Sequence, residues 1–269
     1  MRRVLPILPV ALLLAAAPAL GAGPTSVELE DFTWTELRDA IAGGKTTAIV
    51  PIGGTEQNGP VMALGKHNVR AKALAERIAA KLGDAIVAPV MAYAPEGTIE
   101  PPQAHVKFPG TLTIPDAVFE SLLDWTAQSL RHAGFKTIVF LGDHGGYQKD
   151  MAAVADRLTS KWLKSDVRVY AIADYYRVTQ TDYVQALKDH GAPAGEIGTH
   201  AGLADTSLML AIDPALVRKD KLATADGLTE SNGVYGGSPK HATAALGQLG
   251  VDLIVDHTVA AIKKAAARQ

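Results

Sequence analysis

The sequence predicts an α/β protein, a three-layer α/β/α sandwich with a largely parallel central sheet. Two observations lead to this fold class. Short apolar segments alternate along the chain with amphipathic segments of about a dozen residues or more, which is typical of parallel strands covered by helices on both faces. The 269 residues are 48% apolar and 20% charged, so the chain can bury a sizeable core. No repeats or linkers divide it.

The N-terminal segment differs from the rest of the chain. Arg2 and Arg3 precede an apolar run at 4–20, and small residues at 19–22 suit a signal peptidase. We therefore expect residues 1–22 to be a cleaved signal peptide that leaves a single domain at 23–269. The expected location is periplasmic or secreted, with no stable membrane anchor after cleavage. An uncleaved anchor is the alternative.

Charge and cysteine content exclude several classes of site. The net charge is −2 and no block of lysines and arginines occurs, so nucleic acid is not an expected partner. The chain has no cysteine, which excludes a thiolate metal site and a catalytic cysteine. Export without disulfides fits a bacterial periplasmic enzyme with a large core.

The first elements are predicted by caps and periodicity. A capping box at 33–36 begins a helix. A β-branched apolar run at 46–52 predicts a buried strand. Apolar residues at helical spacing, followed by a glycine, predict a helix at about 68–82. A second strand is expected at 85–92, although Pro89 makes its interior uncertain.

The rest of the chain continues the alternation after a long polar connection at 93–113. Structureless connections of this length are usually functional. The expected elements that follow are a helix at about 115–132, a strand at 136–141, a helix ending at 163, a strand at 167–173, an ambiguous helical segment at 175–187, a helix around 208–212 and a last helix around 246–259.

Polar loops follow the expected strands. In parallel sheets, ligands collect at the carboxyl ends of the strands. The loops at 53–67 and 142–146 occupy that position, so Glu56, His67 and His144 could meet there. For a single loop, a tight turn with solvated polar residues is the simpler interpretation.

Several of the eight histidines lie beside carboxylates in glycine-rich or long loops. Each histidine alone could be structural, but together they favour a metal site built from nitrogen and oxygen ligands. The histidines are His67, His105, His144 and His200, and the carboxylates are Glu56, Asp143, Glu196 and Asp205.

Such a site suits hydrolysis. A catalytic divalent ion takes about three or four His, Asp or Glu ligands and leaves a position open for water. The ion acidifies that water to a pKa of roughly 7, which makes it a nucleophile at neutral pH. Amide hydrolysis also needs a polarised carbonyl and a proton for the leaving nitrogen, which a histidine could supply. A serine triad is less suitable, because no Gly-x-Ser-x-Gly elbow occurs.

Four motifs carry a resemblance to a known family. The segments Gly54–Pro60 and Leu64–His67 resemble the Gly-Ser-Thr-Glu-Gln-His-Gly-Pro-His … Leu-Gly-Thr-Asp motif of the creatininase (creatinine amidohydrolase) family. His105–Thr111 is similar to its His-x-x-Phe-Pro-Gly-Thr, and Asp143–Gly146 to its Gly-His-Gly-Gly turn. His200–Ser207 is similar to its His-Ala-Gly … Glu-Thr-Ser. The resemblance covers nearly the whole mature chain.

The resemblance implies an α/β/α domain that assembles as a homo-oligomer, often a hexamer. It also implies metal-dependent hydrolysis of non-peptide C–N bonds in small or cyclic amides. Glu56, His144 and Asp205 fall on metal-ligand positions, with Asp205 replacing the usual glutamate. His200 falls on the position of a candidate proton donor, and His105 on that of a site-lining residue.

Two departures from the family motif affect the metal. Asn58 stands where the family has a liganding histidine, and His67 stands where it has the aspartate that bridges two metals. A neutral imidazole offers one lone pair to one ion, whereas a carboxylate can serve two. We therefore expect one divalent ion per chain, zinc, manganese or iron, with Glu56, His67, His144 and Asp205 as ligands.

The predicted function is metal-dependent hydrolysis of a non-peptide C–N bond in a small amide, either cyclic or linear. Metal-activated water is the nucleophile. The alternative is a periplasmic protein that kept the fold, lost the chemistry and binds a small molecule or a metal. The candidate catalytic residues are His200 and Glu196, and the candidate substrate-binding residues are Asn58, His105, Asp143 and Tyr147.

Overall fold

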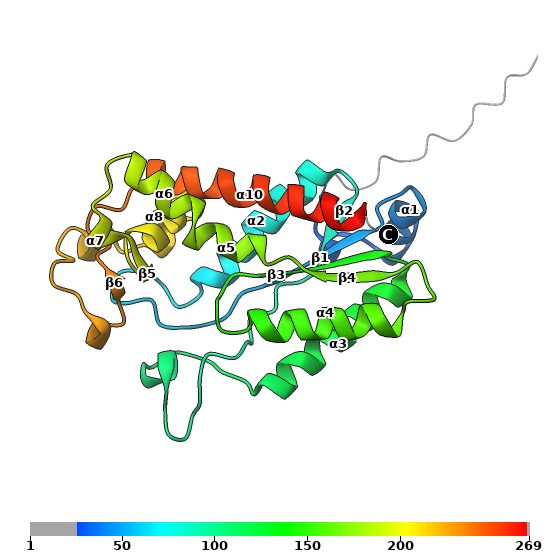
Figure 1. Cartoon of the computed structure of the whole chain (residues 1–269), viewed down its shortest axis with the longest axis horizontal. Helices are drawn as coiled ribbons and strands as arrows, with labels where there is room; N and C mark the ends of the chain where they lie inside the picture. Colours follow the sequence, from blue (N-terminus) through cyan, green and yellow to red (C-terminus); the bar gives the residue numbers. More distant parts are fainter. Residues whose placement is uncertain (1–25, 268–269) are drawn as a thin grey trace, which may run out of the picture.

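A parallel four-stranded sheet lies at the centre of the computed structural model, which describes residues 26–267 (Figure 1). The strand order is β2-β1-β3-β4, and β1 and β3 pair along their whole length. The strands are β1 (Thr47–Ile52), β2 (Ala85–Val87), β3 (Thr137–Gly142) and β4 (Arg168–Ala171).

Helices cover both faces of this sheet. The longer ones are α1 (Trp34–Ala42), α2 (Lys66–Leu82), α3 (Asp116–Ala133), α4 (Gln148–Lys161), α5 (Asp174–Gln180), α6 (Asp182–Asp189), α8 (Leu203–Ile212) and α10 (Ala244–Ala266). Short elements complete the described chain: α7 (Ala194–Ile197), α9 (Lys219–Leu222), β5 (Gly198–His200), β6 (Tyr235–Gly237) and the 3-10 turns Leu29–Asp31, Ala104–Lys107, Pro214–Leu216 and Glu230–Asn232.

Neighbouring residues of the central strands enter different hydrophobic clusters. Ile49 and Val139 pack with α2, α5, α6, α8 and α10, whereas Val50 and Phe140 pack with α3 and α4. Successive side chains of a strand point to opposite faces, so each face needs its own helical layer. The three-layer α/β/α architecture expected from the sequence is therefore confirmed.

Two expected elements differ in detail. The strand expected at 85–92 ends at Val87, because Pro89 has no N–H to donate to a neighbouring strand. The segment expected to be helical at 175–187 divides into α5 and α6 at Thr181, whose φ of −124° and ψ of −89° are not helical. The expected signal peptide at 1–22 lies outside the described residues.

Helix α10 is long and apolar enough to cross a membrane, but its packing is that of a core helix. Val251 and Ile254 are buried in the cluster shared with α2, α5 and α8. The close approach of α8 requires Gly247, where a Cβ atom would lie 1.8 Å from the Ser207 carbonyl oxygen.

The carboxyl ends of β1 and β3 point toward the small β5–β6 pair and α8 (Figure 1). Strands β5 and β6 pair antiparallel, with His200 opposite Tyr235. Residues from the loops after β1 and β3 thus face residues from the last third of the chain. This end of the sheet holds the candidate site.

Candidate active site and metal centre

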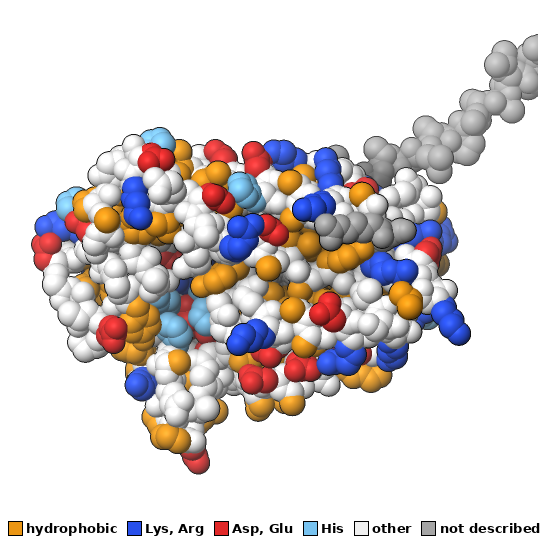
Figure 2. All heavy atoms as spheres, in the orientation of Figure 1, with side chains coloured by type: hydrophobic (Ala, Val, Ile, Leu, Met, Phe, Trp, Pro, Cys, Tyr) orange, Lys and Arg blue, Asp and Glu red, His pale blue; other side chains and the backbone are white. Residues whose placement is uncertain are grey.

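A cavity of about 260 Å³ lies beyond the carboxyl ends of β1 and β3. The start of α2, the loop after β3, β5, β6 and α8 contribute to its lining. Figure 2 shows histidine side chains gathered in a hollow on this part of the surface. The lining is rich in charged and imidazole groups, which suits a small polar ligand.

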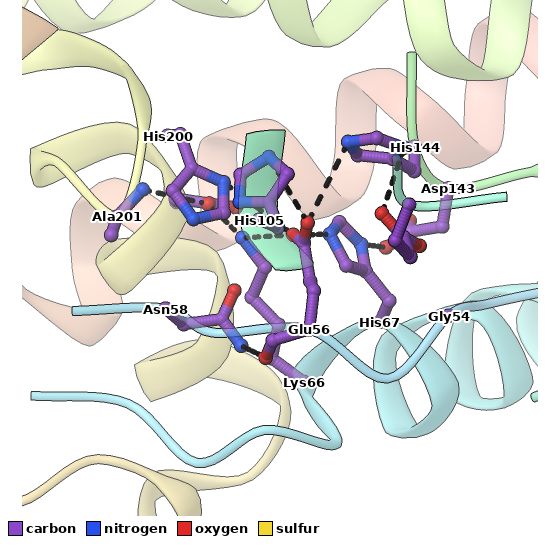
Figure 3. A network of polar contacts seen from close by, with 12 residues as sticks. Gly54, Glu56, Asn58, Lys66, His67, His105, Asp143, His144, His200 and Ala201 are labelled. Carbon is purple, nitrogen blue, oxygen red and sulfur yellow. Dashed lines mark hydrogen bonds and ion pairs between the residues drawn. The ribbon is translucent and has the colours of Figure 1, made fainter. Parts of the chain in front are cut away.

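Glu56 lies at the centre of the site and is fully buried (Figure 3). Its Oε1 atom is 2.6 Å from His67 Nε2 and 3.8 Å from Lys66 Nζ. Its Oε2 atom faces two other imidazoles, at 3.3 Å from His105 Nε2 and 3.7 Å from His144 Nε2. Burial alone would raise the pKa of Glu56, but the charges of His67 and Lys66 hold it well below its usual value.

On one side of Glu56 the charged groups are paired. We call Lys66, His67, Arg70, Asp143 and Asp205 the ion-paired side. Arg70 lies 2.8 Å from Asp143 and 2.5 Å from Asp205, and Lys66 also contacts Asp205. His67 Nδ1 is 2.5 Å from Asp143 Oδ2. Although burial opposes ionisation, Lys66 and Arg70 hold the pKa of Asp205 well below its usual value.

On the other side the carboxyl oxygens lack such partners among the described residues. We call Glu96, His105, His144 and the Oε2 atom of Glu56 the open side. Within residues 26–267, neither Glu96 oxygen nor Glu56 Oε2 has a hydrogen-bond partner. Burial, the charge of Glu56 and the direct contact between the two carboxyl groups raise the pKa of Glu96 to about 10, so its carboxyl group is protonated at neutral pH. Glu96 Oε2 is 3.5 Å from His144 Nδ1.

The local chain makes room for these groups. A Cβ atom on Gly54 would lie 2.3 Å from Glu96 Oε1, and the φ of this glycine is +142°. Only glycine therefore allows the loop after β1 to pass over the Glu96 carboxyl group. Burial lowers the pKa of His144 to about 4 and also lowers that of His105, so both imidazoles are neutral at pH 7.

The open side fits a divalent cation. Ligand atoms of Glu56, His105 and His144 all lie within 4.8 Å of one another. An ionised, unpartnered carboxylate oxygen facing neutral imidazoles is a stable arrangement only when a cation or a proton donor satisfies it. Nitrogen and oxygen donors of this kind suit zinc, manganese or iron.

Some of the residues predicted from the sequence meet here, and others do not. Glu56, His67, His105, His144 and His200 converge, although both ring nitrogens of His67 already face carboxylates. Asp205 lies in the cavity wall, but its oxygens contact Lys66, Arg70 and the Ala201 N–H. The ligand roles of His67 and Asp205 stay predictions.

The remaining candidates have other partners. Asn58 Nδ2 donates to the Glu56 and Ala63 carbonyl oxygens, which shapes the loop after β1. The Tyr147 hydroxyl donates to backbone carbonyls of β1 and the loop after it, and Tyr147 is not part of the cavity lining. Glu196 lies outside the cavity lining and contacts His241 at 2.7 Å.

Five residues of the site were not singled out from the sequence: Gln57, Lys66, Arg70, Glu96 and Tyr235. One signal was available for Lys66 and Arg70. Basic residues in the first turns of a helix oppose its dipole, so they need a compensating acid elsewhere. Glu96 gave no such signal, because nothing in its sequence neighbourhood marks it as buried.

Comparisons with known proteins identify relatives of this chain. A family profile described as creatininase, creatinine amidohydrolase, matches residues 30–262. A creatinine amidohydrolase of Pseudomonas putida is 27% identical over 206 residues, which cover 73% of this chain and 76% of that protein. A mycofactocin precursor peptide peptidase of Mycolicibacterium smegmatis is 29% identical over 65% of this chain, but the match spans only 61% of its own length.

A 3-dehydro-scyllo-inosose hydrolase of Thermotoga maritima is 24% identical over 73% of this chain and 60% of that protein. Solved structures with the same fold include a mutant creatininase, with a TM-score of 0.74 and 25% identity over 90% of this chain and 99% of that one. A manganese creatininase gives a TM-score of 0.73 and 25% identity, covering 89% of this chain and 98% of the other.

Proposed function

The chain belongs to the creatininase family, and from this premise we propose that it is a metal-dependent hydrolase of a non-peptide C–N bond in a small amide. One observation carries the proposal. The ionised Oε2 atom of Glu56 is buried without a hydrogen-bond partner among the described residues, and it faces the neutral imidazoles of His105 and His144 in a cavity open to solvent.

The residues divide the work. Glu56 and His144 would hold a divalent ion, and such an ion polarises a carbonyl and acidifies water. Arg70 and Asp143 fix His67, which in turn fixes one oxygen of Glu56. Glu56 is thereby oriented before a ligand arrives, and this preorganisation favours catalysis.

We propose that one ion binds per chain. The Lys66 ammonium is fully buried, lies 3.8 Å from Glu56 Oε1 and pairs with Asp205. A fixed positive charge at this distance repels a second cation on the same side of Glu56. Metal analysis of the purified protein should therefore give one zinc, manganese or iron ion per chain. Two ions per chain would contradict this.

The relatives are named for different substrates, namely creatinine, an inosose and a precursor peptide. This supports a reaction class, not one compound. The cavity of about 260 Å³ suits a small molecule, such as a lactam or another cyclic amide.

The test is a hydrolysis screen. The purified mature protein is assayed on small cyclic and linear amides, first with chelator and then after addition of Zn²⁺, Mn²⁺ or Fe²⁺. We expect turnover only with metal, its loss in His144→Ala, and its retention in His257→Ala, which changes a histidine of α10 outside the cavity. Activity that survives complete metal removal and His144→Ala would refute the proposal. Metal binding without turnover of any amide would favour the binding-protein alternative.

We also propose that the protein is exported and forms a homo-oligomer. Export is supported by the arginines and the apolar run within 1–22, and oligomerisation by the family resemblance. Cell fractionation with N-terminal sequencing tests the first, and light scattering on the purified protein tests the second. An intact N-terminus in the cytoplasm, or a monomer at high concentration, would contradict them.

A further inference from the structure

Gln57 lies between two imidazoles at the wall of the cavity. Its Nε2 atom is 3.0 Å from His105 Nδ1 and 3.2 Å from His200 Nε2. The two rings are 4.4 Å apart between centroids, and Tyr235 packs against both. The placement of hydrogens on these rings decides what the site can do.

The Gly59 backbone fixes the orientation of the Gln57 amide. A backbone N–H can only donate, and the Gly59 N–H meets Gln57 Oε1 at 2.9 Å. Gln57 Nε2 therefore points to the histidines. Gly233 provides the space for this arrangement, because a Cβ atom there would lie 1.8 Å from Gln57 Oε1. Since an amide nitrogen can only donate, His105 Nδ1 must accept.

It follows that His105 carries its hydrogen on Nε2. A neutral imidazole with an accepting Nδ1 has its proton on the other nitrogen. An accepting Nδ1 also excludes the doubly protonated cation, so the ring is neutral. The Nε2 atom, which carries this hydrogen, lies at the centre of the site, 3.3 Å from Glu56 Oε2, although no hydrogen bond joins the two atoms (Figure 3).

His200 presents the opposite atom to the site. Its Nε2 lies 2.9 Å from the Gln57 carbonyl oxygen, which can only accept, so Nε2 carries the hydrogen. The 3.2 Å approach of Gln57 Nε2 to the same nitrogen is then a packing contact. His200 Nδ1 is left with a lone pair, 3.4 Å from Glu56 Oε1. Thus His105 offers a donor where His200 offers an acceptor.

The backbone holds both rings in place. Ala104, before His105, has a φ of +48°, and Ala201, after His200, has a φ of +54°. Such conformations persist only where the surrounding structure imposes them, and they occur preferentially at functional sites. Thr111 joins the two loops, because its Oγ1 accepts from the Gln57 N–H at 3.1 Å and donates to the His105 carbonyl at 2.8 Å.

We propose that the neutral His105 ring donates its Nε2–H to the carbonyl oxygen of the substrate, and that Gln57 is the positioning residue that maintains this tautomer. The assignment of the carbonyl as partner rests on the proposed amide hydrolysis. As hydroxide, formed when a water molecule loses a proton to solvent, adds to the carbonyl carbon, a C–O bond forms, the π electrons of the C=O bond move to oxygen, and the Nε2–H stabilises the developing charge. The His105 proton is not transferred, so no imidazolate forms. A neutral imidazole can serve as such an electrophile.

The first test reads the tautomer in the absence of substrate. In metal-free protein with ¹⁵N-labelled histidine, two-bond ¹H–¹⁵N correlation spectra separate protonated from unprotonated ring nitrogens, and His105→Gln identifies the His105 signals. We expect wild-type His105 to be protonated at Nε2 and bare at Nδ1. Gln57→Glu replaces the donor by an acceptor, so the two signals should exchange character. Gln103→Glu, an exposed position on the same connection, should change nothing.

The second test reads catalysis. Gln57→Glu should lower kcat by about 100-fold or more, as loss of one oxyanion donor does, with KM changed by less than about threefold. His105→Gln keeps an N–H donor and should retain more activity than His105→Ala. If Gln57→Glu does not fold, Gln57→Leu should give a mixture of the two His105 tautomers.

Protonation of wild-type His105 at Nδ1, or an unchanged tautomer in Gln57→Glu, would overturn the inference even if amides are hydrolysed. Equal activity of His105→Gln and His105→Ala would overturn the donor role. The expected tautomers without any amide turnover would instead refute the proposed function and with it the carbonyl partner, because the spectra need no substrate.

Discussion

The two sides of Glu56 differ in how far their polar groups are satisfied. On the ion-paired side, Arg70 spans Asp143 and Asp205, and Lys66 contacts Asp205. On the open side, Glu96 is buried without a hydrogen-bond partner in the described part of the chain. One carboxylate joins both sides, since Oε1 of Glu56 is bonded to His67 while its Oε2 is free of hydrogen bonds there.

This difference indicates that the ion-paired side stabilises the fold and that the open side binds a ligand. A closed network of buried charges is stable only when complete, and removing one member leaves an uncompensated charge. Unsatisfied buried groups are unfavourable for folding, so their persistence indicates that they serve a ligand. Substitutions on the ion-paired side should therefore reduce stability, whereas those on the open side should reduce metal binding and catalysis.

The largest expected effect is on the open side. His144→Ala should lower metal affinity by at least about 100-fold, because even outer partners of metal ligands contribute about 10- to 100-fold. Hydrolysis should fall by about 1,000-fold or more. The metal-free protein should keep its free energy of unfolding within about 1 kcal/mol, since His144 is not part of the ion-paired network. Metal titration and urea unfolding check both halves. A loss of stability without a loss of metal binding would show that the open side serves folding instead of metal binding.

Arg70→Met tests the ion-paired side. The substitution leaves the buried carboxylates of Asp143 and Asp205 without their shared cation, which should lower the free energy of unfolding by about 3–5 kcal/mol. Urea unfolding at pH 7 with chelator gives the value. Arg77→Met, at an exposed position of the same helix, is the matched control and should stay within about 0.5 kcal/mol. A change below about 1 kcal/mol in Arg70→Met would show that this side is not structural.

Glu96→Gln should stabilise the metal-free protein. The folded-state pKa of Glu96 is about 10 against a usual value of 4.5, because of burial and the charge of Glu56. Between these values the folded chain must bind a proton that the unfolded chain does not, so wild-type stability falls as pH rises. Replacement by the neutral amide should thus add up to about 3 kcal/mol at pH 7 and about 1 kcal/mol at pH 5.

The same unfolding experiment, run with chelator at both pH values, measures this gain. Glu100→Gln, an exposed glutamate on the same connection, should show no such gain. An equal effect of Glu96→Gln at pH 5 and pH 7 would mean that Glu96 is ionised in the folded protein.

The layers of the fold and the centre of the site were predictable because each depends on local signals. The spacing of apolar residues, the helix caps and the turn residues indicate where helices and strands lie. Parallel strands then bring their carboxyl ends to one edge of the sheet. Glu56, His67 and His144 lie in loops after two expected parallel strands, so the sequence indicated that they could meet, and the adjacency of β1 and β3 brings them together. The end of β2 was less certain, because Pro89 interrupts an apolar run.

The partners of these residues were not predictable in the same way. The role of Asp205 as a metal ligand stays a prediction, but its contacts with Lys66 and Arg70 were not predictable, because the sequence gives no distance between α8 and these buried cations. Glu196 precedes the predicted catalytic histidine by four residues, yet the chain turns at Gly198 and places it beside His241. Charge pairing between distant elements depends on the distances between their side chains, which the spacing of apolar residues along the sequence does not predict.

The smallest expected effect concerns the neutrality of the cavity imidazoles. Burial and the charge of Lys66 lower the pKa of His200 from 6.5 to about 3. As pH falls below 6.5, the unfolded chain takes up a proton that the folded chain refuses, so this residue reduces stability by about 2 kcal/mol between pH 7 and pH 5. His200→Gln removes that contribution while its amide can still donate to the Gln57 carbonyl. Urea unfolding of metal-free protein should show a correspondingly smaller decrease from pH 7 to pH 5 in the variant than in wild type or in His132→Gln, which changes an exposed histidine of α3. Equal pH dependence in all three proteins would show that His200 takes up a proton in the folded protein as readily as in the unfolded chain. The cavity would then not keep its imidazoles neutral.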